Sequence, residues 1–103
     1  MVTFIARLKI RPGMREEALN RARAMFEGVR QEEPGALIYL GHQTQSDPDT
    51  LVFFEVYADQ QAAEIHEQTR HFQQLVQDFD TVFDPDFGVQ IEYLDRLGGV
   101  VRT

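Results

Sequence analysis

Cysteine, tryptophan and long apolar runs are all missing from this sequence of 103 residues. The lack of cysteine excludes disulfides, thiolate metal sites and cysteine nucleophiles. No apolar run approaches the length of a membrane-spanning helix, so we expect no membrane association. Small secreted domains usually carry disulfides, so we expect a cytoplasmic protein. The N-terminal apolar run is interrupted by Arg7 and Lys9 and does not resemble a signal peptide.

Positive charge is also scarce, because 10 Lys and Arg stand against 17 Asp and Glu, for a net charge of −7. An acidic domain repels phosphate backbones, and we therefore expect no nucleic-acid partner. The sequence contains neither a glycine-rich phosphate loop nor a dinucleotide-binding fingerprint, so no flavin or nicotinamide cofactor is expected. The length and a hydrophobic fraction of 43% predict one globular domain over residues 1–103.

Changes in apolar periodicity predict the secondary structure. Period-two alternation indicates strands, and spacings of three and four indicate amphipathic helices. The predicted strands are 3–10, 36–45, 51–58 and 87–94, and the predicted helices are 14–33 and about 60–83. We expect Asp59 to cap the second helix and Thr69 to divide it. This βαββαβ order predicts a ferredoxin-like α+β fold, a four-stranded antiparallel sheet with its helices on one face.

The sheet face without helices is predicted to be apolar. The alternation assigns to it Ile5, Leu51, Phe53 and Tyr57, with Val56 facing the core. Apolar patches of this kind usually mark interfaces, and the simplest cover is the same face of a second copy. We therefore expect a homodimer that forms through the sheet. The alternative is that the C-terminal tail or a hairpin arm of the same chain folds over this face.

One stretch of the sequence is distinctive enough to indicate a family. It runs Phe54-Glu55-Val56-Tyr57-Ala58-Asp59, then Ala62, His66 and Thr69-Arg70-His71-Phe72, and Pro34-Gly35-Ala36-Leu37 and Asp47-Pro48 fit the same pattern. It resembles the antibiotic biosynthesis monooxygenase family, dimeric α/β-barrel proteins that include small quinol monooxygenases. The resemblance implies that this chain has the α/β-barrel fold of the family and forms a dimer. The family also includes haem-degrading enzymes, an isomerase and members without a known substrate.

The resemblance also bears on haem. The haem-degrading members resemble one another in an Asn on the first strand, a Trp on the second helix and a later His ligand. The matching positions here are Ala6, His66 and Val76, so haem is not expected. With no other cofactor signal, the protein is predicted to need no cofactor.

His66 is the candidate catalytic residue. It lies on the helix stripe that is predicted to face the sheet, where the family has a functional His. A His in an apolar pocket can accept a proton near neutral pH. The alternative is a buried His that is held by a backbone carbonyl or by Glu55.

Glu55 interrupts an apolar strand, and a buried carboxylate needs a partner. The fold makes the first and third strands neighbours, so Arg7 or Lys9 is the expected partner, and orientation of His66 is the alternative. A metal site is not expected, because His66 and His71 are five residues apart. On one helix this spacing puts them about 140° apart, on different faces.

The sequence therefore supports the hypothesis of a cofactor-independent monooxygenase that acts with O2 on a small phenolic or quinol substrate, with His66 as the base. The predicted substrate-binding residues are Tyr39, Phe54, Tyr57, Ile65, His71 and Phe72. One alternative is an isomerase of a small oxygenated metabolite that uses the same His66. The other is a non-catalytic ligand-binding dimer, which predicts a small cavity and a His66 that is engaged in hydrogen bonds.

Overall fold

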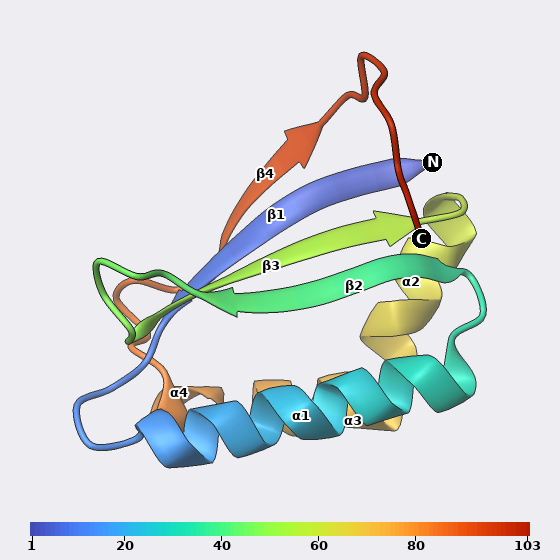
Figure 1. Ribbon diagram of the computed structural model, residues 1–103. Coiled ribbons are helices and arrows are strands. Elements are labelled where there is room, and N and C mark those ends of the chain that lie inside the picture. The colour runs from blue at the N-terminus through green and yellow to red at the C-terminus, as the bar shows by residue number, and fades with distance from the viewer.

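The elements follow one another as predicted, in a computed structural model that describes all residues, Met1–Thr103 (Figure 1). The strands are β1 (Val2–Lys9), β2 (Ala36–Gln43), β3 (Thr50–Tyr57) and β4 (Gln90–Leu94), and the helices are α1 (Arg15–Glu32), α2 (Gln60–Gln68), α3 (Arg70–Gln77) and α4 (Phe79–Val82). The four strands form one antiparallel sheet in the order β2-β3-β1-β4. The fold is therefore ferredoxin-like α+β. None of the helices combines the length and the apolarity needed to cross a membrane.

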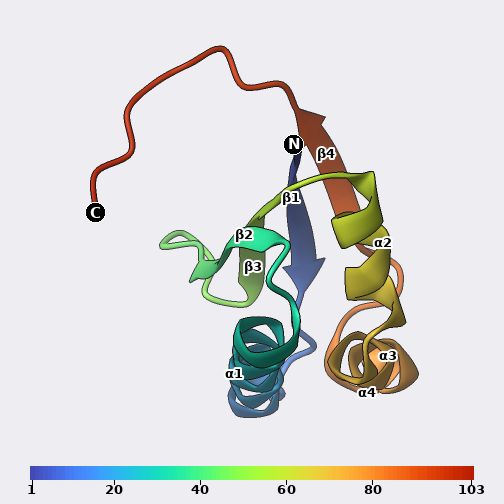
Figure 2. The same ribbon diagram turned by 90° about the vertical axis from the view of Figure 1, so that its right-hand side faces the viewer.

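All four helices lie on one side of the sheet (Figures 1 and 2). The long helix α1 packs beside α3, and α2 packs against β2 and β3. Apolar side chains from the sheet and the helices meet between these layers in a core of Ala6, Leu8, Ile10, Ala18, Leu51, Phe53, Val82 and Phe83. The C-terminal tail after β4 leads away from the helices and does not pack on the sheet, since Leu97, Val100 and Val101 are each at least 74% exposed.

The second helical region is divided at Thr69, as the sequence predicts. Thr69 has an extended backbone, with φ −71° and ψ 155°, between α2 and α3. Its hydroxyl donates to the His66 carbonyl at 2.7 Å and accepts from the Phe72 backbone N–H at 3.3 Å. Asp59 caps α2 by accepting from the Ala62 backbone N–H at 2.8 Å. The Thr69 cap fixes the direction in which α3 leaves α2.

The predicted face assignment of β3 is wrong. Leu51, Phe53 and Tyr57 face the helices, and each is 8% exposed or less. The reason is the register of β1 and β3, which pairs Ala6 with Phe53 and Leu8 with Leu51. Because side chains alternate along a strand, an error of one residue in assigning the core face reverses every side chain of the strand.

An apolar helix-free face nevertheless exists, with other members than predicted. It carries Ile5, Ile38, Leu40, Val52 and Phe54, of which only Ile5 belongs to the predicted set. Leu40 is 52% exposed. Arg7 lies on this face too, 3.9 Å from Glu92 of β4, and Lys9 forms an ion pair with Asp47. Neither cation contacts Glu55, so the predicted ion pair of Glu55 with Arg7 or Lys9 is wrong.

We predict that Thr69→Ala lowers the free energy of unfolding by about 1 kcal/mol, because it removes the side-chain cap of α3. Urea denaturation measures the change. Thr81→Ala is the matched control, because Thr81 is an exposed threonine of α4 and does not cap a helix. Equal effects of the two substitutions would contradict the capping role of Thr69.

Candidate functional site

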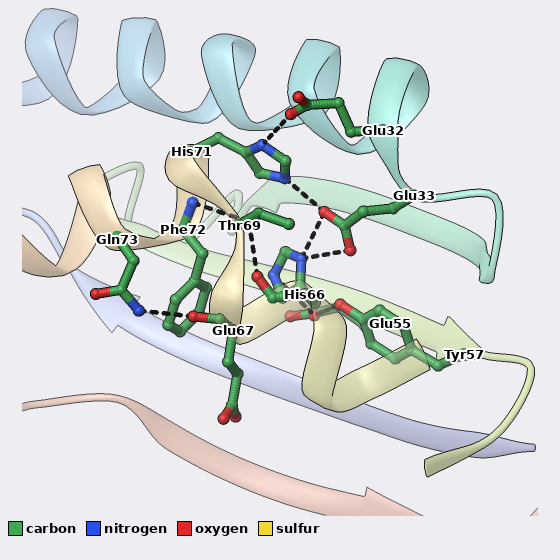
Figure 3. A network of polar contacts seen from close by, with 10 residues as sticks. All are labelled: Glu32, Glu33, Glu55, Tyr57, His66, Glu67, Thr69, His71, Phe72 and Gln73. Atoms are coloured by element: carbon green, nitrogen blue, oxygen red, sulfur yellow. Dashed lines mark hydrogen bonds and ion pairs between the residues drawn. The ribbon is translucent and has the colours of Figure 1, made fainter. Parts of the chain in front are cut away.

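Four ionisable side chains are buried together between the helices and the sheet (Figure 3). Glu33 follows α1, Glu55 lies on β3, His66 on α2 and His71 on α3. Their side chains are 2%, 7%, 5% and 10% exposed, respectively. A cluster of this kind is costly to bury unless its members satisfy one another, so its contacts define the site.

The Glu33 carboxylate is shared by the two histidines. Both of its oxygens lie 2.9 Å from Nδ1 of His66, and its Oε2 lies 2.5 Å from Nε2 of His71. The other ring nitrogen of His71, Nδ1, is 3.2 Å from Oε2 of Glu32. Because a carboxylate only accepts, Nδ1 of His66 carries the proton of the neutral ring, and the lone pair is on Nε2.

Breaks in the helices bring these residues together. Helix α1 ends at Glu32, and Glu33 is its C-cap, whose backbone N–H still bonds to the Val29 carbonyl; Pro34 follows. The extended Thr69 lets His66, at the end of α2, and His71, at the start of α3, turn toward the same place. Their ring centroids are 6.1 Å apart. The predicted separation of about 140° was wrong because it assumed one continuous helix.

Gly28, in the interior of α1, makes room for His71. A Cβ atom built at Gly28 would lie 2.3 Å from Nδ1 and 2.4 Å from Cγ of the His71 ring. Glycine in a helix interior is less stable than alanine by about 1 kcal/mol. Here it allows the imidazole to pack directly against the helix backbone.

Glu55 approaches the opposite side of His66. Its Oε1 is 4.0 Å from Nε2 of His66 and accepts a hydrogen bond of 2.6 Å from the Tyr57 hydroxyl. Glu55 therefore faces the core, against the predicted register. The alternative reading, a carboxylate that lies beside His66, matches its observed position.

Burial shapes the electrostatics of the cluster. It raises the pKa of Glu55 to about 7, which the hydrogen bond from Tyr57 partly opposes. It lowers the pKa of His66, and the hydrogen bond to Glu33 partly opposes that shift. Burial also raises the pKa of Tyr39 and of Tyr57, so both phenols keep their protons. His66 is therefore a neutral imidazole at neutral pH.

Aromatic rings enclose His66. The ring centroids of Phe72, Tyr39 and Tyr57 are 5.1, 5.3 and 5.6 Å from that of His66. Together with His71, these are four of the six residues predicted to bind substrate.

The other two predicted binding residues lie elsewhere. Phe54 pairs with Ile5 on the helix-free face, so the sheet separates it from His66. Ile65 is 44% exposed, because neighbouring residues of a helix point about 100° apart and His66 takes the inward direction. The structure thus places Phe54 and Ile65 away from the cluster around His66.

Three hollows adjoin the site. One of about 280 Å³ lies beside His71, and the other two share Tyr39. An open groove of about 500 Å³ runs between the end of α1 and β2, and Glu33 and Tyr39 both line it. A small cavity of about 70 Å³ lies between the helices and the sheet, and Glu55 and Tyr39 line it together with apolar side chains such as Phe53 and Leu75. Tyr39 is the one residue that lines both the groove and the small cavity.

Two members of the site were missed in the sequence. Nothing distinguishes Glu33 from the other acidic residues of α1, because its burial depends on where the helix ends relative to α2 and α3. Gly28 did leave a signal, since an interior glycine in an otherwise good amphipathic helix often marks a close approach.

Comparisons with known proteins agree with the fold. The family model described as "Antibiotic biosynthesis monooxygenase" matches residues 1–78. YcnE of Bacillus subtilis, named as a candidate monooxygenase, is 33% identical over 76 residues, which are 74% of this chain and 79% of that protein. An uncharacterized Synechocystis protein is 26% identical over 76 residues, 74% of this chain but only about half (51%) of that longer protein. A crystal structure of an antibiotic biosynthesis monooxygenase is 32% identical, with a TM-score of 0.84, over 95% of this chain and 100% of that one.

We predict that Gly28→Ala fails to give the gain of about 1 kcal/mol in the free energy of unfolding expected from helix propensity. The new methyl group would displace the His71 ring from its place against α1. Urea denaturation measures the stability, and NMR of the His71 imidazole reports the displacement. Ala24→Gly, at an exposed position of α1, is the control and should cost about 1 kcal/mol. A full gain with an unchanged His71 signal would show that the ring does not pack there.

Proposed function

The chain belongs to the antibiotic biosynthesis monooxygenase family, and we propose that it is a cofactor-independent monooxygenase of small phenolic or quinol substrates. The observation that carries the proposal is the arrangement around His66. Its Nδ1 is engaged by Glu33, burial lowers the pKa of its ring, and its Nε2 is left as a proton acceptor among aromatic side chains.

The proposed reaction begins with transfer of the phenolic proton to Nε2 of His66. The Glu33 carboxylate holds Nδ1–H and stabilises the imidazolium that forms, since the ring then carries a positive charge beside a carboxylate. The phenolate is electron-rich enough to give one electron to O2 without a metal. The resulting radical pair combines to form a peroxide anion on the ring carbon, and the proton held at Nε2 of His66 returns to it to give the hydroperoxide.

Loss of water from the hydroperoxide gives the quinone. A phenol with a ring C–H thus takes up one O2, one oxygen atom becomes the new carbonyl oxygen, and the other leaves as water. The substrate supplies both hydrogens of that water and the electrons, so no external reductant is needed. The protein contributes the base, an apolar surrounding and a fixed orientation of the substrate.

The groove and the cavity that meet at Tyr39 offer a place for an aromatic ring. The groove, at about 500 Å³, has the size of a small-molecule site, whereas the cavity of about 70 Å³ does not. We propose that the substrate enters from the groove and that Tyr39 moves to admit it toward His66. Tyr39, Tyr57, His71 and Phe72 are the proposed binding residues.

A non-catalytic ligand-binding protein is the second candidate, and two observations favour it. His66 is engaged in hydrogen bonds with Glu33, and the enclosed cavity is small. These are the features expected if His66 holds the fold together. An isomerase of an oxygenated metabolite, which uses the same base without O2, has no observation of its own in its favour.

The proposed assembly is a homodimer that forms through the helix-free face of the sheet. This face carries Ile5, Ile38, Leu40, Val52 and Phe54, and neither the helices nor the C-terminal tail of the same chain covers it. A second copy with the same face is self-complementary by two-fold symmetry. The cytoplasm is the proposed location, since small secreted domains usually carry disulfides and this chain contains no cysteine.

We predict O2 uptake by the wild-type protein, purified and assayed in excess chelator, with a panel of quinols and anthrone-like phenols. His66→Gln should lower the rate about 10²- to 10⁴-fold, the usual contribution of a general base. An oxygen electrode measures the rate, and ¹⁸O2 should place one labelled atom in the product. His42→Gln is the matched control, because His42 is exposed on β2 and lies on the helix-free face, so the sheet separates it from His66.

Equal rates in wild type and His66→Gln would contradict the base role. No uptake across the panel, with binding of the same compounds retained in both proteins, would favour the ligand-binding candidate. Product formation without O2 would favour the isomerase.

For the assembly, light scattering should give the wild type twice the chain mass of 11.9 kDa. Leu40→Glu puts a charge on the helix-free face, and it should shift the protein to the mass of one chain because the charge would be buried without a partner. Val76→Glu, on the exposed side of α3, is the control and should leave the mass unchanged. A wild type with the mass of one chain at high micromolar concentration would contradict the dimer.

A further inference from the structure

We propose that Glu33, His66 and His71 form a binding site for one divalent first-row transition-metal ion. The three ligand atoms lie within 4.8 Å of one another. Metal–ligand bonds of about 2.0–2.2 Å place neighbouring ligands about 3 Å apart. Glu33 lies 2.9 Å from Nδ1 of His66 and 2.5 Å from Nε2 of His71, close to that spacing (Figure 3).

In each histidine, the ring nitrogen that would not bind the metal faces a carboxylate. This arrangement is typical of metal-binding histidines. Metal-bound imidazoles almost always direct their second nitrogen to a carboxylate, a carbonyl or water. Nδ1 of His71 is 3.2 Å from Glu32, and Nε2 of His66 is 4.0 Å from Glu55. Glu55 is itself held by the hydrogen bond from Tyr57. Glu32 is thus within hydrogen-bond distance of its histidine, whereas Glu55 would have to move closer to His66 to form such a bond.

The charge of the buried Glu33 carboxylate also favours a bound cation. Glu32, Glu33 and Glu55 surround two imidazoles, and no Lys or Arg forms an ion pair with any of the three. Glu33 is a buried carboxylate with only histidines as partners, and buried charges are usually paired or bound to metal. A divalent ion would replace the shared hydrogen bonds with metal–ligand bonds.

The ligand set selects the class of metal. Imidazole nitrogens suit zinc, iron, cobalt, nickel and copper, whereas magnesium and calcium prefer oxygen ligands. Three protein ligands leave at least one coordination position for water or a small ligand. The groove of about 500 Å³ that Glu33 lines gives an entry path.

This inference is independent of the proposed function, because it concerns binding and the oxygenase is assayed in chelator. The two states of His66 are also distinct. A metal at Nδ1 leaves the ring proton on Nε2, where it points to Glu55 and can no longer accept a proton. Metal binding without oxygenase activity, or the reverse, would therefore separate the two proposals.

The test is titration of the chelator-treated, dialysed full-length protein with Co²⁺, followed by visible absorption, and with Zn²⁺, followed by calorimetry. We expect one equivalent of either metal per chain, and no binding of Mg²⁺. Glu33→Gln and His71→Gln should abolish binding, and His42→Gln should leave it unchanged. Glu32→Gln should weaken binding about 10- to 100-fold, as loss of an outer-shell partner does.

Absence of binding at millimolar metal, or binding that survives both Glu33→Gln and His71→Gln, would overturn the proposal. Should these variants fail to fold, X-ray absorption of the Co²⁺-loaded wild type decides. Two imidazoles in the coordination shell are expected, and any other number overturns the site.

Discussion

The buried carboxylate of Glu33 is the constraint on which the arrangement of the helices depends. It comes from the end of α1, yet its partners come from α2 and α3, so one group joins three helical segments. A buried charge that loses its partners is costly, by several kcal/mol in typical proteins. The end of α1, the Thr69 break and the gap at Gly28 can each be understood as conditions for these contacts.

The Glu33 contacts also set the chemistry that His66 can perform. By engaging Nδ1, Glu33 fixes the tautomer and leaves Nε2 toward Glu55 and the aromatic rings. Burial keeps the ring neutral, and the nearby carboxylate favours its protonated form once a proton arrives. The two proposals draw on this same geometry, one with a proton accepted by the imidazole and one with a cation between the three side chains, and the two states would exclude each other at Nδ1.

Periodicity predicted most of the fold but not the interior of the site. The order of elements, the Asp59 cap and the break at Thr69 are local features, and the structure confirms them. The face of β3 was predicted in reverse, because Val52, Phe54 and Val56 are as apolar as Leu51, Phe53 and Tyr57. Pattern alone cannot choose between two apolar faces. Only the pairing with β1 does so, and that pairing brings Glu55 to His66.

The sequence also did not predict that residues on either side of a helix break lie close together. His66 and His71 meet because Thr69 redirects the chain, and a rotation count along one helix gave the opposite answer. Glu33 had to be placed by tertiary packing, since 33 residues separate it from His66. The family resemblance identified His66 by position and carried no information about the carboxylate that holds it.

The strand order has a consequence for the path of folding. β1 is made first, yet it lies inside the sheet, between β3 and β4, and its partner Leu94 is far along the chain from Thr3. Pairings so distant in sequence are slow to form, because the loop entropy is lost before the contacts are gained. During synthesis, the backbone N–H and C=O groups on the β4 side of β1 therefore stay unpaired until β4 has left the ribosome. Until then β1 is an edge strand on that side, and unpaired strand edges favour aggregation.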